Sequence, residues 1–71
     1  GVVDSIQDRR SNVFEVGFRA SAFELLFGWQ ENTVTQQHTR LQLSPEHAKL
    51  LHFLLLNAIA EYERRFGLIE E

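Results

Sequence analysis

The segment from Leu43 to Gly67, LSPEHAKLLHFLLLNAIAEYERRFG, predicts one long helix with large apolar side chains on nearly every side. Ser44 is a typical N-cap, Pro45 suits the first helical position, and Gly67 is typical of a helix end. A helix that is apolar all round is normally buried on more than one side. The chain has 71 residues, which is enough for one domain with a small interior. This helix therefore constrains the fold more than any other feature.

Helical geometry, at about 100° per residue, divides these apolar side chains into two groups. The inner stripe is continuous and wide enough to cover a sheet, and it comprises Ala48, Leu51, Leu55, Ala58, Ile59, Tyr62 and Phe66. The outer set lies outside this stripe and includes Leu50, Phe53, Leu54 and Leu56. We expect Leu55, at the centre of the inner stripe, to lie in the core of the chain.

The outer set predicts an oligomer interface. Four large apolar side chains exposed together exceed the patch that a monomer usually shows, and each contributes about 1.5–3 kcal/mol when buried. We expect a second copy of the chain to cover them, most simply through two helices related by a two-fold axis. The alternative is that the N-terminal arm folds over this face within one chain.

Two alternating segments precede the helix and predict a β-hairpin. Residues 11–20 and 22–30 both place an apolar side chain at every second position. A two-residue turn at Ala20-Ser21 would set Phe18 opposite Phe23. The same register would make the next two same-face pairs apolar, Val16 with Leu25 and Phe14 with Phe27, and a one-residue slip would destroy all three.

Residues 33–43 predict a third strand. Leu41 and Leu43 would share a face with Leu25 only if a loop of odd length, three residues near Glu31-Asn32, joined the second and third strands. The predicted fold is therefore α+β: a three-stranded antiparallel meander followed by one long C-terminal helix packed across the sheet. Residues 1–10 are expected to form an N-terminal arm or a short strand, and residues 11–71 a single β-β-β-α domain.

Composition narrows the class of protein. There is no cysteine, so neither a disulfide nor a thiolate metal site can supplement the small core, and self-association becomes the expected source of stability. The net charge of −3 disfavours nucleic acid and anionic membranes as partners. No apolar run reaches the length of a transmembrane helix. We expect a cytoplasmic protein.

The side chains that could carry chemistry do not form a recognisable site. His47 and His52 are five residues apart, about 140° around the helix, so they cannot share a metal as an i,i+4 pair would. No nucleophile motif, phosphate loop or glycine-rich cradle is present. We therefore expect no metal, no cofactor and no enzyme activity. His47 is interpreted as a hydrogen-bonding residue of the helix start, with a ligand contact as the alternative.

The sequence TQQHTRLQ at residues 35–42 suggests a second kind of partner. Gln36, His38, Arg40 and Gln42 would project from one face of a strand, and the first three are candidate contacts for a ligand or partner. Paired strands of this kind can read the major groove of DNA, but basic residues are few. A solvent-exposed strand face is the simpler interpretation, and an open edge that accepts a strand from another protein is intermediate.

Four short stretches carry a resemblance to a known family: Asn12-Val13, AFELLF at 22–27, LSPEHAK at 43–49 and YERRFGLI at 62–69. They resemble a group of short bacterial and archaeal proteins classified only as a domain of unknown function, with an S-P-x-H-A-K helix start and a Y-E-x-x-F-G-x-I ending. Ala22 and Leu26 stand where that pattern has acidic residues. The resemblance covers residues 11–69, implies the architecture above and brings no established activity.

The sequence thus predicts a small non-catalytic module that associates with itself, as a homodimer or a higher oligomer, and binds another protein or builds an assembly. The alternative is a small nucleic-acid-binding regulator that uses the third strand, and an enzyme comes third.

Overall fold

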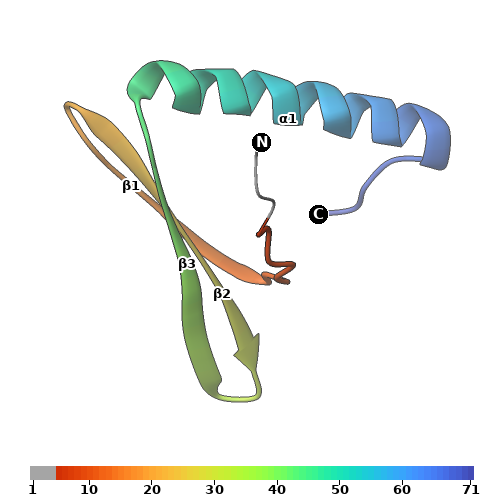
Figure 1. Cartoon of the computed structure of the whole chain (residues 1–71). Coiled ribbons are helices and arrows are strands. Elements are labelled where there is room, and N and C mark those ends of the chain that lie inside the picture. The colour runs from red at the N-terminus through yellow and green to blue at the C-terminus, as the bar shows by residue number, and fades with distance from the viewer. Residues whose placement is uncertain (1–4) are drawn as a thin grey trace.

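The computed structural model describes residues 5–71, and the first four residues of the predicted arm lie outside that range. Three strands, β1 (Val13–Arg19), β2 (Ala22–Glu31) and β3 (Val34–Leu43), precede one helix, α1 (Pro45–Phe66). The strands form an antiparallel sheet in the order β1-β2-β3 (Figure 1). The α+β class and the meander followed by a C-terminal helix are confirmed. Residues 5–10 form neither helix nor strand.

The first hairpin has the register that the alternation predicts. Phe18 pairs with Phe23 across the turn at Ala20-Ser21, and their ring centroids lie 5.9 Å apart. The pairs Val16 with Leu25 and Phe14 with Phe27 are also confirmed. One face of this hairpin is therefore apolar along its length, because directly opposed residues project to the same side.

The connection between β2 and β3 differs from the prediction. The turn between the two strands has two residues, Asn32 and Thr33, and Asn32 adopts a positive φ of 57°, which asparagine does more readily than most residues. The extra residue lies instead in a β-bulge, where the register moves from Phe27 opposite Thr39 to Gly28 opposite Gln37, leaving His38 unpaired. This bulge still brings Leu41 and Leu43 to the apolar face, opposite Leu25 and Phe23.

The bulge depends on Gly28, the one buried residue of the described chain. A Cβ atom at this position would lie 2.6 Å from the backbone oxygen of Gln36. Gly28→Ala should therefore lower the free energy of unfolding by about 1–3 kcal/mol, the usual cost of overpacking. Gly17→Ala is the control, because a Cβ there meets nothing within 4 Å. Urea denaturation of both variants checks this, and equal midpoints would contradict it.

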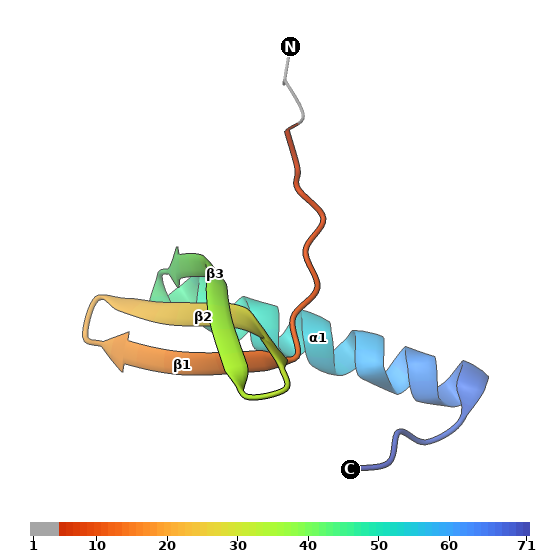
Figure 2. The same ribbon diagram turned by 90° about the horizontal axis from the view of Figure 1, so that it is seen from below.

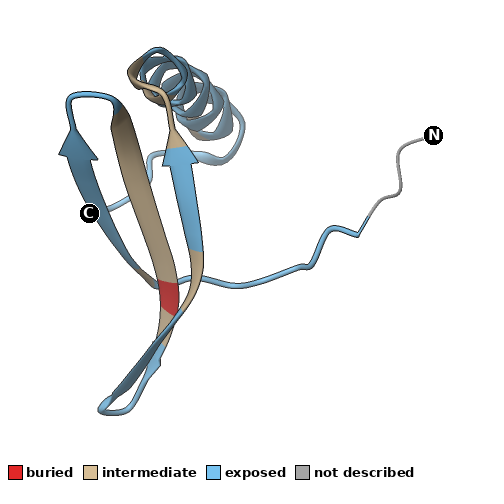
Figure 3. Ribbon diagram, turned by 60° about the vertical axis from the view of Figure 1, so that its left-hand side comes forward, coloured by how far each residue is buried: buried red, intermediate tan, exposed pale blue. Residues whose placement is uncertain are grey.

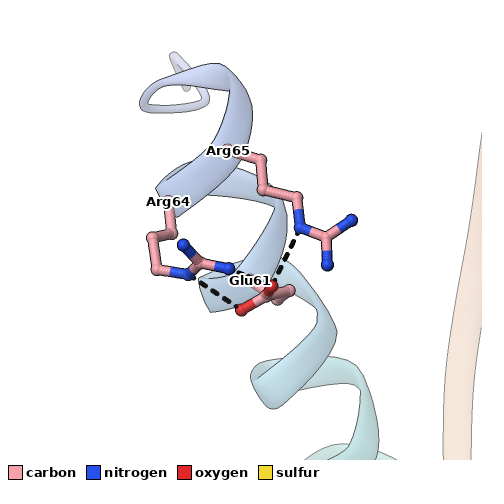
Figure 4. A network of polar contacts seen from close by, with 3 residues as sticks. All are labelled: Glu61, Arg64 and Arg65. Atoms are coloured by element: carbon pink, nitrogen blue, oxygen red, sulfur yellow. Dashed lines mark hydrogen bonds and ion pairs between the residues drawn. The ribbon is translucent and has the colours of Figure 1, made fainter.

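Both ends of α1 follow the local signals in the sequence. The Ser44 hydroxyl accepts a hydrogen bond from the His47 amide at 3.2 Å, and the helix ends where Gly67 takes a φ of 100°. In the last turn, the Arg64 Nε donates to Glu61 at 3.1 Å and the Arg65 Nε at 2.9 Å (Figure 4). These bonds, Arg64 first, hold the pKa of Glu61 below its usual value.

The helix does not lie over the sheet along its length. It starts at the end of β3 and then runs past the strands, so that its C-terminal half has no strand beside it (Figures 1 and 2). The radius of gyration is 15.0 Å, against about 11 Å for a compact chain of this length. No apolar side chain of residues 5–71 is buried. Residues 5–71 therefore form a paired sheet and a helix, but they do not enclose a core between them.

Candidate functional site

An open apolar groove lies in the angle between the sheet and the first half of α1. Its volume is about 800 Å³. Most of its lining is apolar, from all three strands and the helix: Phe14, Glu15, Val16, Phe23, Leu25, Phe27, Leu43, Pro45, Ala48, Lys49, Leu51, His52 and Leu55. Soluble monomers rarely expose a contiguous apolar surface of this kind, and such surfaces mark binding or interaction sites. It is the candidate functional site of this chain.

The inner stripe of α1 is divided between two environments. Ala48, Leu51 and Leu55 line the groove, as a sheet-facing assignment predicts. The remaining large members, Ile59, Tyr62 and Phe66, contribute nothing to its lining and are exposed. The prediction that Leu55 lies in the core of the single chain is wrong, because 57% of its surface is exposed. The groove that it lines has no occupant from the described residues.

The outer set is also uncovered. Leu50, Leu54 and Leu56 are exposed, and Phe53 keeps 49% of its surface accessible. The described part of the N-terminal arm does not cover this face, because it contacts the sheet and then leads away from the helix (Figure 3). The alternative in which the arm folds over the outer set is therefore not found in residues 5–10. The assignment of this set to an oligomer interface stays a prediction.

The exposed area shows how much surface is left unpaired. The chain exposes 6710 Å² for a mass of 8.3 kDa. A compact monomer of that mass exposes about 4,600 Å², so this chain exposes about 2,100 Å² more than a closed fold. Obligate homodimers bury about 2,000–5,000 Å² in total. Two chains together have an excess of about 4,200 Å², which lies within the range that a stable dimer buries.

The N-terminal arm is fastened to the sheet at the bulge. The Arg9 guanidinium donates to the His38 backbone oxygen at 3.1 Å, and the His38 Nε2 lies 2.9 Å from the Arg10 oxygen. The Arg10 guanidinium lies 4.9 Å from the centroid of the Trp29 ring, within the range of a cation–π contact. These groups line a shallow depression, but they are occupied with one another and hold the arm in place.

Asn12 continues the β1–β2 ladder with its side chain. Its amide nitrogen donates to the Gln30 oxygen at 2.9 Å, and its amide oxygen accepts from the Gln30 nitrogen at 2.7 Å. The side chain thus replaces a backbone peptide group at the start of the strand. This role of Asn12 was not predicted from the sequence. The feature that could have indicated it is an asparagine directly before an alternating segment.

The candidate contact residues of β3 do not share one face. Gln36 stands opposite Trp29 and Arg40 opposite Leu26, and these two β2 residues are an odd number apart, so they project to opposite sides. The prediction of a single polar face is wrong because the bulge at His38 reverses the alternation. Arg40 also forms an ion pair with Glu24 at 3.1 Å.

His47 lies at the helix start, apart from the β3 residues. Its Nδ1 is 3.0 Å from the Ser44 hydroxyl, so the local hydrogen bonding expected there is present. A ligand contact at His47 stays a prediction.

Residues 5–71 hold neither a metal-binding cluster nor a membrane-spanning helix. Within residues 5–71, no group of three or more histidine, cysteine, aspartate or glutamate side chains could hold a metal ion. The one helix of that range is not long and apolar enough to cross a membrane.

Comparison with known proteins places most of the chain in one family. The model described as "Protein of unknown function (DUF3467)" matches residues 4–71. The resemblance seen over residues 11–69 is therefore confirmed. No curated protein and no solved structure matches the chain.

Proposed function

The chain belongs to the DUF3467 family of proteins of unknown function, and we propose that it acts as a non-catalytic module that associates with itself as an obligate homodimer. The observation that carries this proposal is the absence of any buried apolar side chain among residues 5–71. A chain with no fully buried apolar side chain gains less of the hydrophobic free energy that offsets the entropy of folding. A second copy supplies the missing surface.

Two features favour a copy of this chain over an unrelated partner. Each chain carries both an empty apolar groove and a helix with more apolar surface than its own sheet covers. A two-fold dimer satisfies both at once, because an isologous interface uses the same surfaces on each copy. The absence of cysteine agrees with a reducing compartment, and we include a cytoplasmic location in the proposal.

The assembled dimer presents the polar side of the sheet to other molecules. That side carries the Arg40–Glu24 ion pair, and the edge of β1 can accept a strand from another protein. Binding of another protein, or growth into a larger assembly, would use these surfaces, because dimerisation occupies the apolar ones.

Sedimentation equilibrium of the unmodified protein tests the proposal. We expect a dimer at micromolar concentration, and a midpoint of thermal unfolding that rises with protein concentration, because association stabilises the folded state by mass action. A folded monomer whose unfolding midpoint is independent of concentration would show that the proposal is wrong.

A further inference from the structure

We infer that the two copies exchange the C-terminal halves of their helices: Ile59, Tyr62 and Phe66 of one chain occupy the apolar groove of the other. This inference rests on the proposed function, and it names the occupant of the groove. The first observation is that the groove takes its helical lining from Pro45 to Leu55 and none from residues 56–66.

The protruding half of the helix has the shape and chemistry that the groove requires. Ile59, Tyr62 and Phe66 follow the i, i+3, i+7 spacing of one helical face, and the Tyr62 and Phe66 rings lie 5.0 Å apart. The ion-paired residues Glu61 and Arg64 fall outside this face at about 100° per residue. The three inserted side chains are therefore apolar, like most of the groove lining.

Helix length and symmetry agree with this arrangement. The 22 residues of α1 rise about 33 Å, so the half that leaves the sheet is long enough to reach a neighbouring groove. Each chain offers this groove and the protruding half of α1, and reciprocal insertion about a two-fold axis gives both a partner.

The area to be covered also requires more than a helix–helix contact. The sheet side of the groove carries Phe14 and Val16, exposed on the edge strand β1, and a contact between the outer sets alone would leave these residues in water. Insertion of the partner helix covers the sheet and the inner stripe with one element. A second copy bound only through its outer set does not.

The test is a nuclear magnetic resonance experiment on the unmodified protein, with half of the copies labelled with ¹³C and half unlabelled. A filtered spectrum then records contacts between copies only. We expect cross-peaks between the Tyr62 ring of one copy and the Val16 methyl groups of the other. The pair Phe18–Phe23, which is in contact within one chain, is the control and should be absent from the filtered spectrum.

Three outcomes distinguish the exchange of helices from self-association in general. Cross-peaks between Tyr62 and Val16 of different copies support the exchange. A dimer whose only intermolecular cross-peaks join the outer sets of the two helices overturns the exchange and leaves the self-association intact. A protein that is monomeric by sedimentation, with an empty filtered spectrum, overturns both.

Discussion

The double substitution Phe53→Glu and Leu54→Glu should abolish dimerisation, raising the dissociation constant by more than about a thousand-fold. Each lost apolar contact is worth about 1.5–3 kcal/mol, and the two-fold axis doubles the loss. The new carboxylates would also be desolvated without partners in the contact, which adds a further penalty. Sedimentation equilibrium over a concentration series measures the change directly.

A matched control adds the same charge elsewhere. Thr33→Glu with Thr35→Glu places two carboxylates at the exposed β2–β3 end of the sheet, and its dissociation constant should stay close to that of the unmodified protein. The Phe53→Glu, Leu54→Glu variant is expected to be either a monomer or unfolded, which circular dichroism distinguishes. If this variant dimerises as tightly as the unmodified chain, the outer set is not part of the interface.

Leu55→Ala should lower the free energy of unfolding by about 2–5 kcal/mol per chain, the usual cost of a large-to-small change in a core. In a single chain the side chain is more than half exposed, so most of this loss can arise only if a second copy closes the groove over it. Chemical denaturation at a fixed protein concentration, within the dimeric range, measures it.

Gln42→Ala is the control for Leu55→Ala, because Gln42 is an exposed polar residue of β3, opposite Glu24 and on the side of the sheet away from the groove. Exposed substitutions usually change stability by less than about 0.5 kcal/mol. A loss below about 1 kcal/mol for Leu55→Ala would mean that this part of the groove stays open to solvent in the assembled protein.

The parts of the fold that local rules decide were predictable from the sequence. The Phe18–Phe23 register followed from alternation, because a slip of one residue would move every apolar side chain of a strand to the wrong face. Ser44 and Gly67 set the helix bounds through capping. The bulge at His38 was not predictable in the same way, because residues 35–39 are polar on both faces and no pattern there marks an extra residue.

The placement of the helix could not be read from one chain's pattern. The inner stripe identifies side chains that must be covered, and this holds equally for Leu55 and Phe66. The stripe does not show whether the sheet of the same chain or that of a second copy covers these side chains. The sequence pattern is the same in both cases. The groove was missed for the same reason: its concave shape arises from the angle between α1 and the sheet.

A core that forms only between two copies has a genetic consequence. Suppose that two alleles are expressed together and one carries a substitution in the groove. The altered copy still has an intact outer helix face, so it can pair with a normal copy. The resulting dimer then has a defective core. Most dimers in such a cell would contain at least one damaged copy. A missense allele of this gene would then be dominant. A deletion would be recessive, because the remaining normal copies still pair with one another.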